Sequence, residues 1–487
     1  MKLKISLLIV TLLVQMSVQS QDKPKWDVNN PPGKYTEVSF TIDEGTWMNI
    51  DVSPDGKTIA FDLLGDIYTM PVSGGEATCI RSGLAWEVQP RWSPDGKMIL
   101  FTSDSGGGDN IFRMKPDGSE VTQITKESFR LLNNAEWTPD GMYIIARKHF
   151  TSTRSLGAGE MWMYHISGGE GLQLTKRKND QQDVNEPSVS PDGKLLYYSE
   201  DVYPGGYFQY NKDPNSEIFV IQSYDMATGE IKRVAGGPGG ACRPQVSGKG
   251  DKLAFVRRIR EKSVLFVQEL STGREWPVYD GLSKDQQEAW TTFGVYPGFD
   301  WLPGDKEIII WAGGKIKKVD VEKRTATDIP FRVNAKHRMM ETVQFENKAF
   351  EEEYEAKVLR NLVTSPDGSR IVFSALGYLY MTSNGSVPQR ITSGEDFEAE
   401  PSFDASGNRL VYVTWNDEKL GQIKVWDFGT STSTGVTDEP AIYRTPSFSP
   451  DGKTIVYRKE GGNGHQGFIY NLNSGIYNIP TAGGKPQ

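Results

Sequence analysis

The sequence has little cysteine and little histidine. Cys79 and Cys242 are the only cysteines among 487 residues, and they fall at different places in the repeats described below. A disulfide framework therefore does not hold this fold, and we expect two buried free thiols. No two of the four histidines stand at the spacing of a metal-ligand pair: His149, His165, His337 and His465. Each is expected to be a surface or loop residue and not a ligand.

An excess of basic residues is also missing. The formal net charge is -9 and the isoelectric point is near 5.3. Because neutralising phosphates needs a basic surface, this charge argues against nucleic acid as a partner. The acidic run Glu351 to Glu353 is expected to be a solvated segment.

The amino-terminal apolar stretch, Leu7 to Leu13, is too short to span a bilayer comfortably. With Lys2 and Lys4 before it and a small-residue site at Ser20 after it, residues 1–20 have the pattern of a secretory signal. We expect a cleaved signal peptide, a periplasmic or secreted chain and no later membrane span. An uncleaved anchor is the alternative, and a lipoprotein anchor is disfavoured because no Cys follows.

Amphipathic helical periodicity of convincing length is absent, whereas a turn motif recurs nine times. An apolar run enters Ser-Pro-Asp-Gly, or a variant of it, and a second apolar run leaves it, with copies about 40 to 60 residues apart. The copies begin at Ser53, Ser93, Thr138, Ser190, Ser247, Leu302, Ser365, Asp404 and Ser449. This spacing is typical of propeller blades or solenoid units.

The second copy predicts a four-stranded antiparallel meander. Its strands are expected at Pro90 to Trp92, Met98 to Thr102, Asn110 to Met114 and Val121 to Thr125. Pro presets the first central turn position, Asp bonds its own backbone and Gly accepts a positive φ. One such sheet cannot bury both faces, so the units must stack, and closure into a propeller protects most strand edges. A linear β-solenoid is the alternative fold.

The order of the copies predicts an all-β chain with two propellers. Residues 21–36 form a leader, 37–335 a six-bladed propeller of four-stranded antiparallel blades, and 336–487 a partial second propeller of about three blades. Glu37 to Glu44 is expected to close the ring by pairing with the sixth blade. Asn478 to Gln487 stops where an outer strand should begin, so we expect a truncated piece of a longer protein, or a blade completed by another strand.

Loop lengths indicate a candidate binding face. Blades one and six need only Leu63 to Asp66 and Ala312 to Lys315 between their second and third strands, whereas blade three uses Arg147 to Glu160 and blade four Ser199 to Glu217. Elaborated loops on a rigid scaffold commonly bind ligands. The candidate residues for binding a ligand or docking a domain are His149, Arg154, Tyr203, Tyr207, Phe208, Tyr210 and Asp213. The alternative is that their aromatic rings only pack the loops against the blades.

Two glycine-rich segments are expected to be structural. Asp104 to Asn110 lacks the ligand series of a calcium loop and lies where a hairpin is required. Gly236 to Gly240 has no following helix that could receive a phosphate. No metal or cofactor site is expected in this chain.

The turn repeats, with GDIY at Gly65 to Tyr68 and SGGEAT at Ser73 to Thr78, resemble TolB-like propellers, including those of tricorn-type proteases. The longer runs TSTRSLGAGE, YNKD, ALGYLY and TWNDEKLG resemble exported bacterial amidohydrolases that carry such a propeller region ahead of a metal-dependent barrel. These runs are Thr151 to Glu160, Tyr210 to Asp213, Ala375 to Tyr380 and Thr414 to Gly421. The resemblance covers nearly the whole chain after the signal segment.

The resemblance implies a non-catalytic region that binds or gates an amide or peptide-like substrate and docks a catalytic domain holding a metal, expected to be zinc. The His-x-His pair of that family is absent from this chain, so catalytic residues are expected beyond Gln487. A stand-alone envelope protein-binding module similar to TolB and the propeller half of a tricorn-like peptidase remain open. No GxSxG elbow is present, which disfavours a serine peptidase for the chain by itself.

Overall fold

The computed structural model describes residues 26–128, 130–151, 157–204, 212–342, 352–353, 355–461 and 473–487. Every regular element in these ranges is a β-strand, which confirms the all-β prediction. Contacts divide the chain into two compact units, Met1–Gln209 with Ser216–Thr342, and Tyr210–Asn215 with Val343–Gln487. The predicted signal peptide lies outside the described residues.

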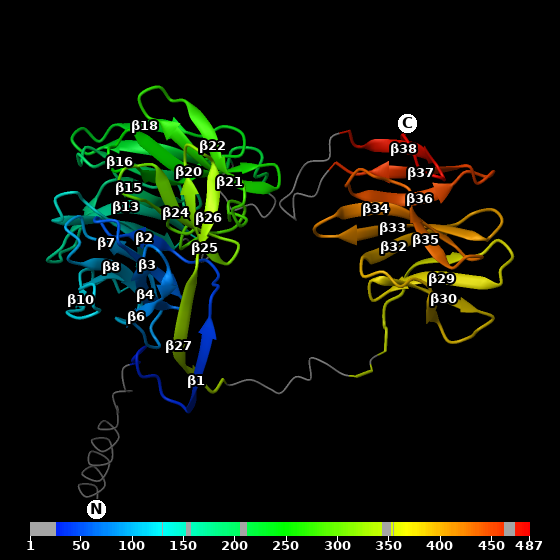
Figure 1. Ribbon diagram of the computed structural model, residues 1–487, viewed down its shortest axis with the longest axis horizontal. Coiled ribbons are helices and arrows are strands. Elements are labelled where there is room, and N and C mark those ends of the chain that lie inside the picture. Colours follow the sequence, from blue (N-terminus) through cyan, green and yellow to red (C-terminus); the bar gives the residue numbers. More distant parts are fainter. Residues whose placement is uncertain are drawn as a thin grey trace, which may run out of the picture. The chain divides into compact units, whose positions relative to one another are not determined.

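The first unit contains six four-stranded sheets in its described part, each an antiparallel meander (Figure 1). Sheets one to three are β2 (Ile50–Val52), β3 (Thr58–Leu63), β4 (Asp66–Pro71) and β6 (Thr78–Arg81); β7 (Glu87–Trp92), β8 (Ile99–Ser103), β9 (Asn110–Met114) and β10 (Thr122–Gln123); and β11 (Leu131–Trp137), β12 (Tyr143–Thr151), β13 (Gly157–His165) and β14 (Leu172–Gln173). Sheets four to six are β15 (Val184–Val189), β16 (Leu195–Asp201), β17 (Phe219–Asp225) and β18 (Ile231–Ala235); β19 (Cys242–Val246), β20 (Lys252–Ile259), β21 (Lys262–Glu269) and β22 (Glu275–Tyr279); and β23 (Asp300–Trp301), β24 (Glu307–Ala312), β25 (Lys315–Asp320) and β26 (Thr325–Ile329). The strands predicted for the second repeat are confirmed to within a few residues.

The repeated turn closes in the same way in all nine copies. The backbone N–H of the first turn residue donates to the carbonyl five residues later, as from Ser93 to Met98 at 2.8 Å. The Ser93 hydroxyl donates to Asp95 and accepts from the N–H of Met98. The hydrogen bond from the Ser93 hydroxyl lowers the pKa of Asp95 to about 2. The turn therefore fixes the register between the first and second strand of each sheet.

Successive sheets of the first unit contact one another, and the sixth contacts the first. The N–H of Ile50 in sheet one donates to Gly298 O at 2.8 Å, and the N–H of Val52 donates to Asp300 in sheet six at 3.3 Å. On the side of the repeated turns, Gly56 of sheet one lies against Pro303 of sheet six. The sheets thus form a closed ring, as in a propeller.

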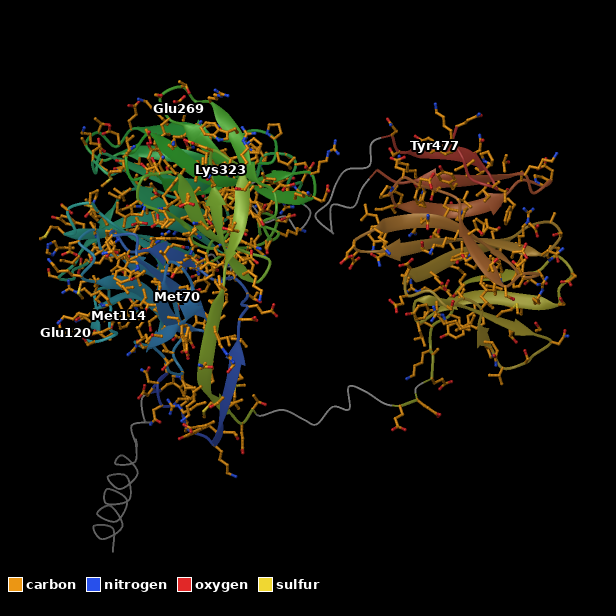
Figure 2. All side chains as sticks on the ribbon, viewed as in Figure 1. Met70, Met114, Glu120, Glu269, Lys323 and Tyr477 are labelled. Carbon is orange, nitrogen blue, oxygen red and sulfur yellow. The ribbon has the colours of Figure 1, made fainter. Side chains whose placement is uncertain are left out.

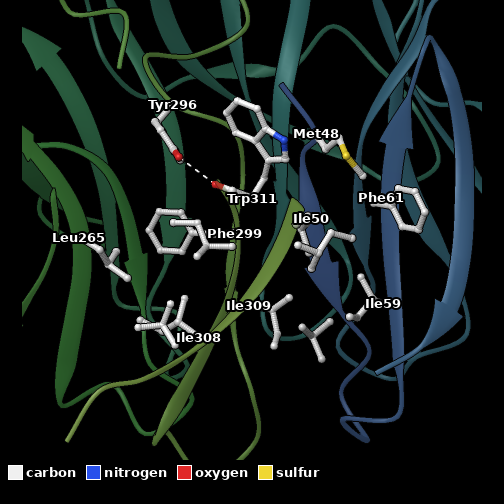
Figure 3. Packing of buried hydrophobic residues seen from close by; sticks show 14 of the residues in the cluster. Met48, Ile50, Ile59, Phe61, Leu265, Tyr296, Phe299, Ile308, Ile309 and Trp311 are labelled. Carbon is white, nitrogen blue, oxygen red and sulfur yellow. Dashed lines mark hydrogen bonds between the residues drawn. The ribbon is translucent and has the colours of Figure 1, made fainter. Parts of the chain in front are cut away.

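The largest apolar cluster joins sheets one, five and six (Figure 3). Ile50 and Phe61 of sheet one and Ile308 and Ile309 of sheet six are fully buried. The Tyr296 hydroxyl donates to Trp311 O at 2.8 Å, which satisfies a polar group inside this cluster. The seam where the ring closes is therefore the most extensive part of the core.

The prediction that the amino-terminal strand pairs with the sixth blade is wrong. β1 (Tyr35–Ile42) pairs antiparallel with β27 (Phe331–Met340), and not with a strand of the sixth sheet. β27 pairs in parallel with β5 (Gly75–Glu76), beside sheet one. Figure 1 shows β1 and β27 as a two-stranded ribbon beside the sheets. Phe331 and Val333 of β27 are buried in the main cluster, and β27 is the central strand of a three-stranded sheet between β1 and β5.

The second unit has two four-stranded sheets and one three-stranded sheet in its described part. Their strands are β28 (Arg360–Thr364), β29 (Arg370–Ala375), β30 (Tyr378–Ser383) and β31 (Gln389–Arg390); β32 (Phe397–Phe403), β33 (Arg409–Asn416), β34 (Leu420–Asp427) and β35 (Thr432–Gly435); and β36 (Tyr443–Phe448), β37 (Thr454–Lys459) and β38 (Gly475–Pro480). Their apolar clusters are smaller than that of the first unit. Most residues of β28 are exposed, whereas the first strands of sheets two to five are largely buried.

The thiols differ from the prediction in one respect. Both cysteines are free and Cys242 is buried, but Cys79 is exposed. Cys79 lies on β6, the outer strand of sheet one, in which Thr78 and Cys79 are exposed and Ile80 and Arg81 are partly buried. Figure 2 labels Glu120 and Lys323, which lie in the turns before the outer strands of sheets two and six. Outer strands and their turns thus form the solvated rim of the unit.

Candidate functional site

The axis of the first unit is lined by residues from one repeat position. These residues stand four places before each repeated turn: Asn49, Gln89, Asn134, Glu186, Arg243 and Gly298. Gln89 Nε2 donates to Asn134 Oδ1 at 2.8 Å, and Arg243 Nη1 donates to the same oxygen at 3.0 Å. The N–H of Gly298 donates to Asn49 Oδ1 at 2.8 Å, so the hydrogen bonds cross the seam as well.

A second layer lies two residues nearer to the repeated turns. Its members are Asp51, Arg91, Glu136, Ser188, Gln245 and Asp300. Arg91 pairs with Asp51 at 2.8 Å and lies 3.6 Å from Glu136. Burial raises the pKa of Glu136 to about 7 and raises the pKa of Asp300 well above its usual range. These two carboxyl groups therefore bind their protons more tightly than exposed ones do, although Arg91 lies in the same layer.

The backbone is bent where the first layer forms. Gln89, Asn134, Glu186 and Arg243 have φ between 50° and 61°, a region that favours glycine. Each lies at a register shift between the first and second strand of its sheet. A bulge of this kind re-aims a side chain, here toward the axis. Residues of the first layer and Arg91 enclose a cavity of about 10 Å³, room for one water molecule. The axis is therefore narrow where these residues meet.

One mouth of the axis is crossed by the connection between β22 and β23, residues 280–299, which we name the strap. Asn185 Nδ2 of sheet four donates to Thr291 O at 3.2 Å, and Gln89 Nε2 of sheet two donates to Phe293 O at 2.9 Å. Glu186 accepts from the N–H of Val295 at 2.6 Å. Side chains at this mouth thus bind the strap through its backbone groups.

The remaining sheets hold the strap at other points. In sheet five, Arg258 pairs with Asp285 at 2.7 Å and with Glu288 at 2.9 Å, and the first two side chains are fully buried. Trp290 Nε1 donates to Gly157 O of sheet three at 3.3 Å. Tyr296 reaches sheet six and Gly298 reaches sheet one through the hydrogen bonds given above. The strap consequently contacts all six sheets.

His149 is at the same mouth, but it is neither a loop nor a surface residue as predicted. It lies in β12, is 3% exposed, and its ring is 5.4 Å from that of Trp290. Burial, with the charges of three arginines, lowers the pKa of His149 to about 4, so the imidazole is neutral. The loop predicted at Arg147 to Glu160 is shorter than expected, because β12 continues to Thr151 and β13 starts at Gly157.

The other predicted residues are not gathered into one site by the described chain. Tyr203 packs against the main apolar cluster, and its N–H donates to Asp201 at 2.8 Å, which fits the alternative structural role. Asp213 accepts from the N–H of Asn215 at 2.8 Å. Arg154, Tyr207, Phe208 and Tyr210 lie outside the described residues.

Sequence reasoning missed the strap and both axial layers. The layers could have been found by aligning the nine turns and reading the residues two and four places before them. The strap carries no turn motif, and its length of 20 residues between two strands was the available signal.

The described residues contain no group of three or more His, Cys, Asp or Glu side chains arranged to hold a metal ion. No helix in the described ranges has the length and apolar character needed to cross a membrane.

Comparison with known proteins gives partial matches. The family model described as TolB beta propeller domain matches residues 39–206. An uncharacterized protein of Agrobacterium fabrum, Atu1656, is 30% identical over 158 residues, 30% of this chain and 52% of its own length. The uncharacterized peptidase YuxL of Bacillus subtilis is 34% identical over 152 residues, 30% of this chain and 20% of its own.

The Tol-Pal system protein TolB of Helicobacter hepaticus is 26% identical over 159 residues, 32% of this chain and 37% of its own length. The crystal structure of TolB from Acinetobacter baumannii is 17% identical with a TM-score of 0.43, covering 59% of this chain and 66% of that one. The matched segments span about half or less of these curated relatives. This chain is all-β and contains a TolB-like β-propeller region.

Proposed function

We propose that the chain is the non-catalytic propeller region of an exported, metal-dependent amidohydrolase, and that the strap face of the first unit docks the catalytic domain or a peptide-like substrate. In this proposal the protein is periplasmic or secreted after cleavage of residues 1–20. The metal, zinc by our expectation, belongs to the catalytic domain.

One observation carries the proposal: the strap, which is the longest connection between two strands in the described part of the first unit, lies at one face of the ring. The turns after the first strands repeat a single hydrogen-bonding pattern at the opposite face. The strap lies at the face where β12 ends and β13 begins, since Trp290 Nε1 donates to Gly157 O. Variable segments on a rigid scaffold are where binding residues usually occur.

The narrow axis supports binding at a face over gating through the ring. A cavity of about 10 Å³ admits no substrate larger than water, so passage through the ring would require both axial layers to separate. Binding at the strap face needs no such rearrangement. We therefore place substrate contact at the face and not in an axial channel.

Two other functions are favoured by specific observations. The match to the TolB beta propeller domain favours a stand-alone envelope module that binds proteins. The similarity to the peptidase YuxL favours the propeller part of a peptidase. Fold alone does not decide among these functions, because propellers host many activities.

The coding sequence that follows codon 487 tests the proposal. A barrel with a His-x-His pair supports it, an immediate stop codon favours the stand-alone module, and a serine-peptidase domain favours the peptidase. In the full polypeptide, the double variant Arg154→Ala/Tyr207→Ala should lower kcat/KM at least several-fold. The matched control is Lys57→Ala/Lys97→Ala in the exposed turns of the opposite face. Equal kinetics of the two double variants would contradict docking at the strap face.

A further inference from the structure

Three buried side chains of sheet three carry polar atoms without a hydrogen-bond partner in the part of the chain that the structure describes. Asn133 and Arg147 are 0% exposed and His149 is 3% exposed. The unpaired atoms are Asn133 Oδ1 and Nδ2, Arg147 Nη1, and His149 Nδ1 and Nε2.

Strand register brings the three side chains together. Asn133 of β11 is directly opposite Arg147 of β12, and such pairs project from the same side of a sheet. His149 is two residues beyond Arg147 on the same strand, so it projects from that side too. Gly159 of β13 is opposite His149 and adds no side chain there. The five atoms therefore belong to one cluster.

This arrangement is unfavourable unless something pairs with it. A buried donor or acceptor left unpaired costs about 1–3 kcal/mol. Native proteins contain few such groups, and a cluster of them calls for a water molecule, an ion or a ligand.

Trp290 of the strap lies against His149 of this cluster. Its ring is 5.4 Å from the His149 ring, it is half-buried, and one hydrogen bond, to Gly157 O, fixes its indole N–H. The strap residues on either side, Ala289 and Thr291, are not buried. We therefore expect the Trp290 side chain to move when a ligand reaches His149.

The charges around the cluster favour an anion. Arg147, Arg130 and Arg177 are the charged groups that act on the His149 ring, and all three are cations. Asp183, a carboxylate beside the cluster, is already engaged by Arg147 Nε and Nη2 and by the N–H of Gly159, and Arg177 pairs with Asp180 at 3.4 Å. Glu160, next along β13, projects from the other side and accepts from Trp162 and Gln173.

We propose that Asn133, Arg147 and His149 form a binding site for the carboxyl end of a peptide, with Trp290 as its cover. Arg147 Nη1, Asn133 Nδ2 and one imidazole N–H donate to the carboxylate oxygens. Asn133 Oδ1 accepts from the neighbouring amide N–H of the ligand, and the other imidazole nitrogen accepts from water. The ligand itself pairs four of the five atoms, and the site requires no catalytic domain.

Titration of the full chain with small probes tests this site. N-acetylglycine carries a carboxylate and an adjacent amide N–H, acetate carries the carboxylate only, and N-acetylglycinamide lacks the charge. We expect N-acetylglycine to bind more tightly than acetate, and the amide not to bind, measured by calorimetry and by shifts of the His149 ring resonances. Trp290→Ala should raise the affinity at least tenfold, because it removes the cover.

Asn133→Leu and His149→Phe should each lower the affinity at least tenfold while circular dichroism and the melting temperature show a folded chain. His165→Phe, in the same sheet, is the matched control and should bind as the unmodified chain does. If none of the three probes shifts the His149 resonances, even in Trp290→Ala, the five atoms are satisfied by water only and the site is refuted. This outcome leaves the docking proposal untouched, since that proposal is tested by the kinetics of the full polypeptide.

Discussion

Glu136 is a carboxyl group on the axis whose protonation affects stability. Burial raises its pKa to about 7, although Arg91 lies 3.6 Å away and favours the charged form. An unfolded glutamate titrates near 4.3, so the folded chain holds this proton more tightly. The protonated Glu136 carboxyl therefore stabilises the folded chain fully below the pKa of an unfolded glutamate, and this stabilisation is lost as the pH rises through 7.

We therefore expect the free energy of unfolding of the unmodified chain to fall by on the order of 1–3 kcal/mol between pH 4.5 and pH 8 relative to Glu136→Gln. Urea unfolding at several pH values measures this difference. Glu120→Gln, in an exposed turn, is the control and should run parallel to the unmodified chain. A Glu136→Gln curve that is also parallel would contradict the protonated axis.

Single residues also show how far sequence reasoning reached. Ser93 and Asp95 were predicted as turn residues, and the turn forms because its hydrogen bonds are local. The burial of His149 was not predicted, because it depends on how far β12 extends and on Trp290, more than a hundred residues away in the chain.

At the scale of elements, the strap is fixed at its start by the buried pair of Arg258 and Asp285. Arg258→Met should destabilise the chain by about 3–5 kcal/mol, because it leaves a buried carboxylate without its partner. The double variant Arg258→Met/Asp285→Leu should recover most of that loss. Chemical unfolding checks both, and additive losses in the double variant would show that the pair does not act as a unit.

The β1 ribbon has a different role from the predicted ring closure. Deleting residues 26–42 removes the partner of β27 but none of the hydrogen bonds from Ile50 and Val52 to the sixth sheet. We expect a lower melting temperature with one cooperative transition retained for the first unit. Loss of that transition would mean that β1 does close the ring.

Elements without a repeat signal were the ones that sequence reasoning placed wrongly. The nine turns predicted the sheets because each turn specifies its own two strands. β1, β27 and the strap pair with distant segments, and their partners depend on which apolar positions the closed ring leaves uncovered, such as those that receive Phe331 and Val333.

At the scale of the whole molecule, the two units have separate cores of unequal size. The main cluster of the first unit includes Ile309, whereas Ile455 belongs to a smaller cluster of the second. Both side chains are fully buried. We expect two transitions in calorimetry, with the second unit melting first.

Truncating one side chain in each core assigns the transitions. Ile455→Ala should shift only the lower transition and Ile309→Ala only the upper one, each by the equivalent of about 2–5 kcal/mol. A single transition that both variants shift equally would contradict independent cores.

The strap has a consequence for how such a ring can evolve. Tandem repeats usually gain or lose a copy by duplication or deletion, since each copy meets only its neighbours. Here the strap, a segment of 20 residues, contacts every sheet. An extra sheet would widen the ring and separate the strap from several of these contacts at the same time. The number of repeats around this axis is therefore locked by a segment that is not itself a repeat.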